Sequence, residues 1–395
     1  MTSNERWLLP EGIVEVLPEQ AAILEHMRRK VLDLYNSWGY VLVMPPFIEY
    51  LESLLVGTGN DLDLQTFKLI DQLNGRSMGI RADMTPQVAR IDAHHLKSDL
   101  PTRLCYIGTV LHTRPDGFAG SRSPLQVGAE LYGHQGIESD AEVLTLMIET
   151  LMTCGVTSPY LDIGHVGIFR GLAQQAGLSK EQEHELFDAL QRKAKPEISD
   201  MLQGWALPND ISNMLNGLAD LNGEVDVLAQ AKQLFKAANK NVLTALAEIE
   251  QVAAITTKRF PDLALHYDLA ELRGYHYHTG VVFAAYVPGQ GQAIAQGGRY
   301  DGIGEVFGNA RPATGFSSDL KTLLILGEST GNGRKLASIL APADDDEDLF
   351  QMVKRLRAEG ECVICLLPGQ KIDMQAIGCN RQLVKKKDQW QVETI

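Results

Sequence analysis

The chain has 395 residues, 45% of them apolar and 22% charged, which is the composition of a globular protein with enough residues for two or three domains. Its formal net charge of −14 argues against the basic face that binds nucleic acid, and no apolar run reaches the length of a membrane-spanning helix. Five scattered cysteines and an N-terminus without a signal-peptide pattern fit a reducing compartment. We therefore expect a cytoplasmic protein that has neither nucleic acid nor a membrane as its partner.

The first half of the chain alternates predicted helices with predicted strands. Apolar residues recur at helical spacing between Glu19 and Trp38, with Pro18 before them and Gly39 after them. An Asn-Gly pair at 74–75 is a strong signal for a β-hairpin turn. The predicted elements are a helix over 19–38, strands over 40–44, 66–71 and 76–83, a helix over about 85–97, strands over 104–112 and 125–133 joined by a polar loop, and a helix over 138–152.

The second half begins with a segment of different composition. It is rich in Ala, Leu, Gln and Glu at helical spacing, which predicts a helical insertion. Strand patterns return at 263–269 and 281–287, a glycine-rich segment and a helix follow, and a short tail combines strands, one helix and a terminal hairpin. The sequence thus predicts an α+β fold, an antiparallel sheet flanked by helices. The main domain is expected over 1–178 and 252–327, the helical insertion over 179–251, and a small C-terminal α/β region over 334–395.

Several common catalytic and metal motifs are absent from the sequence. There is no phosphate loop, no H-E-x-x-H and no G-x-S-x-G. Cys362 and Cys365 form a C-x-x-C pair, but no second pair or nearby histidine completes a four-ligand zinc site. Because both lie in an apolar run, we interpret them as core cysteines on a buried strand and expect no metal centre.

A strand with one polar face is the clearest sign of a binding site. Gln126, Gly128, Glu130 and Tyr132 alternate with apolar residues, so they share a face that is either solvated or lines a pocket. Three other features favour a pocket. They are Asp83 and Thr85 at a strand-to-helix boundary, the run 273–280 with a cation, aromatic rings and imidazoles between glycines, and the glycine-rich run 297–302.

These side chains match the needs of a free amino acid. Such a ligand needs a carboxylate for its ammonium group, an arginine for its carboxylate, and polar or aromatic groups for its side chain. Glu130 or Asp83 can supply the first and Arg273 the second, with a buried structural ion pair as the alternative role for Arg273. The remaining candidates are Gln126, Tyr275 and His276.

Five ordered motifs carry a family resemblance. They are Gly39-Tyr40 through Pro46, Ile80 to Thr85, Gln126-x-Gly128-x-Glu130, Arg273-Gly274, and Gly297 to Gly302 with Gly315-Phe316. Over residues 8–325 the chain resembles the catalytic domain of class II histidyl-tRNA synthetases. The resemblance implies an antiparallel sheet of six or more strands, a homodimer formed through the first motif, and a histidine pocket. It also implies that Asp83, Thr85, Gln126 and Glu130 hold the ammonium and imidazole groups and that Arg273 holds the carboxylate.

Two ATP-binding positions of the synthetase pattern carry other residues here. His112 stands where an arginine would clamp the α-phosphate, and Thr322 where a second arginine would grip the γ-phosphate. Neither offers a fixed cationic fork, and two such losses correspond to roughly 5–8 kcal/mol of transition-state stabilisation. Asp319 adds a negative charge where glycine is usual. We expect adenylation to be lost, although Arg114 and Lys321 lie close enough in sequence to substitute in part.

The tail also departs from the synthetase pattern. The segment after residue 330 is shorter than an anticodon-binding domain and contains the acidic run 344–348, which we interpret as a solvated face. We therefore expect RNA recognition to be lost as well.

A histidine pocket without ATP clamps resembles the regulatory subunits of ATP phosphoribosyltransferase. Their Tyr-x-Tyr-x-Thr-Gly-x-Val-Phe pattern occurs here at 275–283, and the run from Arg81 to Gln87 also fits. The resemblance implies a non-catalytic, allosteric subunit without a cofactor. It implies a hetero-oligomer with a short catalytic subunit that condenses ATP with phosphoribosyl pyrophosphate, the first step of histidine biosynthesis, and feedback inhibition by histidine. The alternatives are an active histidyl-tRNA synthetase-like ligase that uses Arg114 and Lys321, and a free-standing histidine sensor.

Overall fold

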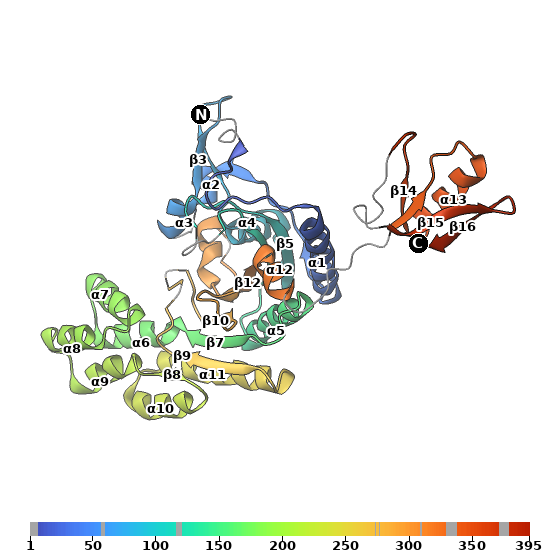
Figure 1. Cartoon of the computed structure of the whole chain (residues 1–395). Helices are drawn as coiled ribbons and strands as arrows, with labels where there is room; N and C mark the ends of the chain where they lie inside the picture. The colour runs from blue at the N-terminus through green and yellow to red at the C-terminus, as the bar shows by residue number, and fades with distance from the viewer. Residues whose placement is uncertain are drawn as a thin grey trace. The chain divides into compact units, whose positions relative to one another are not determined.

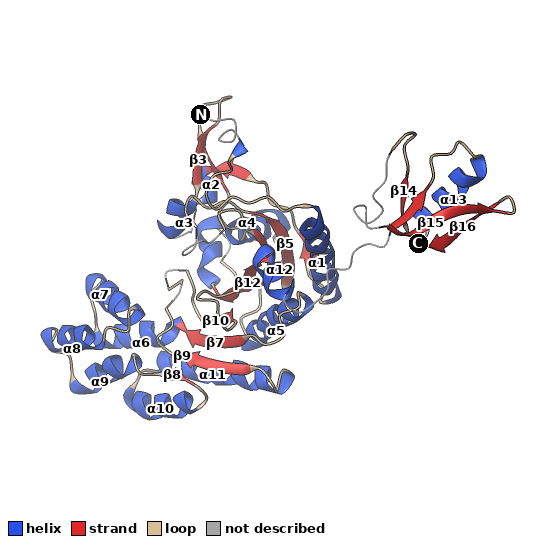
Figure 2. Cartoon of the chain, in the orientation of Figure 1, coloured by secondary structure: helices blue, strands red, loops and turns tan. Residues whose placement is uncertain are grey.

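The computed structural model describes residues 7–56, 60–115, 121–272, 274–275, 277–308, 310–328, 338–370 and 379–395. They fall into two compact units, Met1–Gly331 and Asn332–Ile395 (Figure 1). Both units mix helices with strands (Figure 2), so the predicted α+β class is confirmed. In the described part of the chain, no helix is both long and apolar enough to cross a membrane.

A nine-stranded sheet forms the centre of the first unit. Its strand order is β1-β5-β6-β12-β11-β10-β7-β9-β8. The six strands from β5 to β7 in this order are antiparallel, as predicted, whereas the pairs β1–β5 and β7–β9 are parallel. The strands are β1 Val41–Leu42, β5 Thr102–Thr109, β6 Leu125–Tyr132, β7 Tyr160–His165, β8 Asn222–Gly223, β9 Ala264–Asp268, β10 Val281–Tyr286, β11 Ala295–Arg299 and β12 Ala313–Asp319.

Helices cover one face of this sheet because the strands alternate apolar and polar side chains. Helix α1, Pro18–Ser37, buries Leu24, Met27, Val31 and Tyr35 at helical spacing. These residues share one core with apolar residues of α5, Ile137–Thr153, and with Val127 and Ala129 of β6. Successive side chains of a strand point to opposite faces, so the neighbours Gln126 and Glu130 lie on the face away from this core.

A smaller sheet flanks the central one and confirms the predicted hairpin. Its strands are in the order β2-β4-β3, and the antiparallel pair β3–β4 is joined by a turn in which Gly75 has a φ of +75°. The helix predicted over about 85–97 is present as α4 followed by a π-helix. The elements of this region are β2 Ile48–Tyr50, α2 Leu51–Leu54, α3 Asn60–Gln65, β3 Phe67–Ile70, β4 Ser77–Ile80, α4 Thr85–Ile91 and the π-helix Asp92–Leu96.

The segment predicted as helical is helical and lies next to β7, β8 and β9 (Figure 1). A capping box at Ser179 and Gln182 begins α7. The segment shares the main core through residues such as Leu186, Leu190 and Ile249, so the domain boundaries drawn from the sequence stay a prediction. The helices are α6 Val166–Ala176, α7 Lys180–Gln191, α8 Lys195–Gly204, α9 Asn209–Leu218, α10 Asp226–Leu234 and α11 Lys240–Arg259; α12, Leu320–Glu328, follows β12.

The second unit is a four-stranded sheet with one described helix, and the predicted terminal hairpin is present. The interpretation of Cys362 and Cys365 as core residues was wrong, because both side chains are exposed. They are the end residues of an edge strand, and Val363 is the residue of that strand that packs into the core. The elements are β13 Ser338–Ala341, α13 Glu347–Ala358, β14 Cys362–Cys365, β15 Cys379–Lys386 and β16 Gln389–Thr394, with strand order β14-β13-β15-β16.

Candidate ligand-binding cavity

A cavity of about 720 Å³ lies on the polar face of the central sheet. This volume is in the usual range for small-molecule sites. Strand register brings residues far apart in the sequence into rows across its floor: Gln126 pairs with Asp319, and Glu130 pairs with Gly315. A longer row runs through Ser317, Gln296, Ala284 and Asp162 on β12, β11, β10 and β7.

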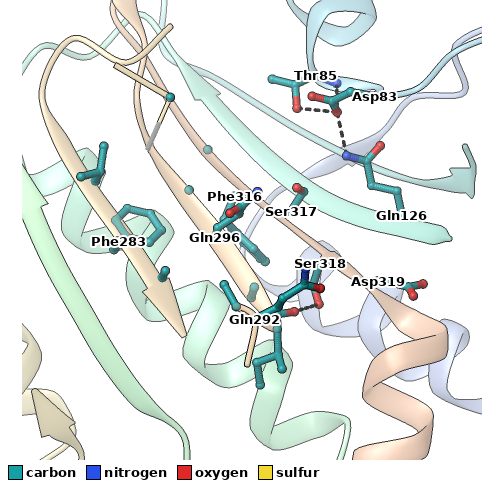
Figure 3. Close-up of a pocket in the computed structure, with 18 of the residues that line it drawn as sticks. Asp83, Thr85, Gln126, Phe283, Gln292, Gln296, Phe316, Ser317, Ser318 and Asp319 are labelled. Atoms are coloured by element: carbon teal, nitrogen blue, oxygen red, sulfur yellow. Dashed lines mark hydrogen bonds between the residues drawn. The ribbon is translucent and has the colours of Figure 1, made fainter. Parts of the chain in front are cut away.

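Asp83, Thr85 and Gln126 form a hydrogen-bonded group at one side of the cavity (Figure 3). The Gln126 amide nitrogen donates to Asp83 Oδ1 at 2.7 Å, and its amide oxygen accepts from the backbone of Met84 at 2.9 Å. Thr85 donates to the same Asp83 oxygen through its backbone nitrogen at 3.0 Å and its hydroxyl at 3.1 Å. These bonds fix the direction of the Asp83 carboxylate. All three bonds to Asp83 end on Oδ1, so Asp83 Oδ2 accepts none of them.

Glu130 lies deeper, and its side chain is enclosed by tyrosine hydroxyls. It is 1% exposed, accepts a hydrogen bond from Tyr106 at 2.9 Å on one oxygen, and accepts another from Tyr300 on the other. Burial raises the pKa of Glu130 to about 8, against the lowering effect of the two hydroxyl groups. Residue 315 must be glycine here, because a Cβ at that position would collide with the Glu130 carboxylate.

The turn that follows Leu272 forms a further part of the wall. Gly274 has a φ of +65°, and its carbonyl accepts from the backbone of Tyr277 at 2.8 Å and of His278 at 2.7 Å. The Tyr277 ring stacks on Tyr300, with ring centroids 5.0 Å apart, and its hydroxyl is buried without a hydrogen-bond partner among the described residues. Tyr277 therefore offers a hydroxyl group that a ligand can satisfy.

The structure brings together four of the seven residues predicted to bind histidine: Asp83, Thr85, Gln126 and Glu130 all line the cavity. Tyr275 does not, because its ring packs between Phe169 and Phe187 and its hydroxyl donates to Glu183. Arg273 and His276 lie outside the described residues. Sequence reasoning missed the tyrosines at 106, 277 and 300, although Tyr277 and Tyr300 lie inside motifs that it singled out.

The two positions without arginine also line the cavity. The buried His112 ring bonds through Nε2 to the Ala82 carbonyl at 2.9 Å. Thr322 donates to Asp319 Oδ2 at 2.8 Å, and Asp319 Oδ1 accepts from the backbone of Lys321 at 3.1 Å. A helix N-terminus favours anions, and here the carboxylate of Asp319 itself occupies the N-terminus of α12.

The charge of the cavity is unsuited to phosphates. Among its described lining residues there is no lysine or arginine. Lys321 directs its ammonium group to the Ser123 carbonyl at 2.7 Å, and burial lowers the pKa of this lysine; Arg114 is exposed and does not line the cavity. Five acidic residues do line it: Asp83, Glu130, Asp162, Glu271 and Asp319.

The glycine-rich run serves strand packing as well as the cavity. A Cβ at Gly298 would lie 2.6 Å from the Val281 carbonyl of the neighbouring strand. Arg299 forms a buried ion pair with Asp140 at 2.8 Å on the opposite side of the sheet from the cavity lining. The motif therefore lets β10, β11 and β12 approach one another closely at the position where Gly297 and Gly315 line the cavity.

Comparison with known proteins identifies the fold. The family model described as histidyl-tRNA synthetase matches residues 12–323, and the model described as ATP phosphoribosyltransferase subunit HisZ C-terminal domain matches residues 336–393. A crystal structure titled ATP phosphoribosyltransferase regulatory subunit/histidyl-tRNA synthetase, from Bacillus halodurans C, has a TM-score of 0.82 at 28% identity and covers 94% of this chain and 95% of that chain. Histidyl-tRNA synthetase from Nostoc sp. PCC 7120 shares the fold, with a TM-score of 0.79 at 20% identity over 98% and 94% of the two chains. The fold is thus that of the class II histidyl-tRNA synthetases.

Full-length relatives identify the family within this class. The ATP phosphoribosyltransferase regulatory subunit of Thioalkalivibrio sulfidiphilus is 60% identical and covers 100% of both chains. The protein of the same name from Nitrosococcus oceani is 55% identical over 100% of this chain and 98% of its own. The chain belongs to the family of ATP phosphoribosyltransferase regulatory subunits. This membership confirms the predicted regulatory, non-catalytic role and does not support the alternative of an active synthetase.

The buried carboxyl group predicts a pH-dependent stability. The pKa of Glu130 rises from an ordinary 4.5 to about 8 on folding, so between these values the folded chain keeps a proton that the unfolded chain has released. Stability must therefore fall as pH rises through this window. Relative to wild type, the free energy of unfolding of Glu130→Gln is expected to rise by on the order of a few kcal/mol between pH 5 and pH 9, since one pKa unit is about 1.4 kcal/mol.

The measurement is the melting temperature of both proteins across that pH range. Glu138→Gln, at an exposed position in the first turn of α5, is the matched control and should follow wild type. If the difference in melting temperature between Glu130→Gln and wild type does not change with pH, the assignment of a buried, protonated carboxyl group is contradicted.

Proposed function

We propose that the cavity binds free histidine and that its occupancy adjusts the activity of a short-form ATP phosphoribosyltransferase catalytic subunit in the same complex. The observation that carries the proposal is the combination of oriented carboxyl groups and tyrosine hydroxyls in a cavity whose described lining has no lysine or arginine. Such a lining favours a ligand with cationic or N–H groups and disfavours phosphates.

The geometry favours one orientation of the ligand. Asp83 is held by Thr85 and Gln126 with one carboxylate oxygen outside that group, which suits the three donors of an ammonium group. Glu130 and the Tyr277 hydroxyl lie deeper, among aromatic rings, where a planar imidazole finds an acceptor for its N–H and a second polar partner. We assign the carboxylate of the ligand to Arg273 and keep His276 as a candidate contact, whereas Tyr275 packs against Phe169 and Phe187 and is not a direct contact.

The catalytic subunit supplies the chemistry in this proposal. It condenses ATP with phosphoribosyl pyrophosphate, the first step of histidine biosynthesis, and depends on the regulatory chain for activity. Histidine inhibits by favouring one arrangement of the complex, and the size of its effect cannot exceed its difference in affinity for the two arrangements. We assign this complex to the cytoplasm, where the reaction's substrates are made and where five free cysteines are stable.

A homodimer within the complex is the second part of the proposal. The first motif contains β1, which is an edge strand of the central sheet, and two apolar side chains of this motif, Val41 and Met44, are exposed. Val41 is 64% exposed, Met44 79% and Ile48, on the adjacent small sheet, 44%. An edge strand with exposed apolar residues is a surface that native proteins usually cover, and a second copy of the chain would cover it.

Histidine binding is expected to depend on Asp83. Replacing Asp83 with Asn removes a charge-assisted hydrogen bond worth about 1.5–3 kcal/mol, so the Kd for histidine should rise roughly 10- to 100-fold. Titration calorimetry of the full-length variants measures this directly. Asp162→Asn is the matched control, because Asp162 lines the same cavity on a distant strand of the floor.

The same variants should alter feedback in the complex. Inhibition of the reconstituted phosphoribosyltransferase should require more histidine with Asp83→Asn than with Asp162→Asn. Equal histidine affinity in wild type, Asp83→Asn and Glu130→Gln would place the histidine site elsewhere and refute the proposal.

The acidic cavity is expected to reject nucleotides. The purified chain should not exchange pyrophosphate into ATP in the presence of histidine, and it should show no ATP binding by calorimetry. Because Asp319 fills the helix terminus and two cationic positions are missing, the triple variant His112→Arg, Asp319→Gly, Thr322→Arg should gain measurable ATP affinity. Pyrophosphate exchange by the wild-type protein would overturn this account of a non-catalytic cavity.

The dimer is expected to depend on the first motif. Met44→Glu places a charge in the exposed apolar surface and should shift the isolated chain from dimer to monomer in size-exclusion chromatography with light scattering. Val225→Glu, at a 63% exposed position before α10, is the control and should leave the mass unchanged. A wild-type chain that is already monomeric, or a Met44→Glu variant that stays dimeric, contradicts this interface.

A further inference from the structure

The turn beside the cavity has two tyrosines that face different parts of the molecule. Tyr277 lines the cavity and stacks on Tyr300, which donates to Glu130. Tyr275, two residues earlier, is 5% exposed and contacts helices α6 and α7 instead. The backbone amides of Tyr277 and His278 both donate to the Gly274 carbonyl, so Tyr277 is tied to the residue that directly precedes Tyr275.

Arg170 of α6 holds this turn without lining the cavity. Its Nη2 donates to the Tyr275 carbonyl at 3.0 Å and to the His278 carbonyl at 3.2 Å. Its guanidinium carbon also lies 4.9 Å from the centroid of the Tyr275 ring, within cation–π distance. A single cation thus fixes both ends of the segment that carries Tyr277.

Helix α7 holds the same turn from the other side. The Tyr275 hydroxyl donates to Glu183, and the ring packs on Phe187 one turn further along, with centroids 5.3 Å apart. Burial raises the pKa of Tyr275, so the hydroxyl remains a donor throughout the physiological range. The chain two residues beyond the end of α7 is attached as well, since Lys193 forms an ion pair with Asp268 at 2.8 Å, and Asp268 precedes the turn.

We propose that Arg170, Tyr275 and Glu183 are positioning residues for the ligand site, and that they couple its occupancy to the order of helix α7. The inference rests on the proposed histidine site and extends it to side chains that do not touch the ligand. A ligand that contacts Tyr277 restrains the turn, and the turn restrains α7 through Tyr275. A ligand that orders the cavity therefore also orders helix α7.

Hydrogen exchange of the full-length chain with and without saturating histidine tests the coupling. In wild type, histidine should slow amide exchange in peptides covering 180–191 as well as in the cavity strands. Glu183→Ala, which removes the acceptor of the Tyr275 hydroxyl, should reduce or abolish the slowing in α7 while the slowing in the cavity strands remains. Glu181→Ala, at an exposed carboxylate on the same turn of the same helix, is the matched control and should behave as wild type.

The positioning role of Arg170 has its own measurement. Arg170→Met keeps a long side chain but removes the hydrogen bonds of a charged donor, and should raise the histidine Kd about tenfold. Arg170→Lys restores a cation within reach of the two carbonyls and should recover part of the affinity. A merely structural role would instead lower the melting temperatures of both variants without this difference in Kd.

The outcomes separate this inference from the function on which it rests. Histidine binding by wild type with unchanged exchange in α7, or identical behaviour of Glu183→Ala and Glu181→Ala, refutes the coupling and leaves the histidine site intact. Absence of any histidine binding by wild type refutes both. Glu183→Ala truncates one half-buried side chain on a helix, so it provides a result even where Arg170→Met does not fold.

Discussion

The burial of one carboxyl group, that of Glu130, organises the centre of this molecule. At 1% exposure both of its oxygens need hydrogen-bond partners, and the hydroxyl groups of two tyrosines from other elements supply them. The same burial requires a glycine at 315 on the paired strand and holds Tyr300 where Tyr277 stacks on it. The glycine at 315, the stacked tyrosines and the polar cavity lining therefore all accompany the burial of this one carboxyl group.

The charge of the cavity explains how a synthetase-like fold serves a regulatory subunit. A nucleotide site on this sheet face needs cations and an open helix N-terminus. Here Asp319 occupies the N-terminus of α12, and the Lys321 ammonium group is directed to the Ser123 carbonyl. The part of the cavity proposed to hold the amino acid needs no such cations, because Asp83 and Glu130 suit an ammonium and an imidazole group. Under the proposed function, a cavity that has these carboxyl groups but no lysine or arginine among its described lining residues serves a single amino-acid ligand.

Local patterns were enough to predict part of this arrangement. The alternation along 125–132 identified the cavity face, since the period of a strand is a local property, and the Asn-Gly turn identified the hairpin. The convergence of Tyr106 and Tyr300 on Glu130 depends on register between strands distant in sequence, which no local pattern contains. Tyr275 was misplaced because it follows Gly274, whose positive φ begins a turn, so Tyr275 does not share a face with Tyr277 as it would on a strand. Cys362 was misplaced because an apolar strand at a sheet edge still leaves side chains exposed.

The position of the turn gives the helical segment a place in regulation. A subunit that only bound histidine would need no contact between its ligand site and α6 or α7. The turn instead presents one tyrosine to the cavity and one to the helices, and Arg170 binds the carbonyls of Tyr275 and His278 on either side of Tyr277. A second attachment, Lys193 to Asp268, is in the same stretch of chain. Under the proposed coupling, a small change at Tyr277 becomes a change in the order of helix α7, because packed cores switch between discrete arrangements rather than deform continuously.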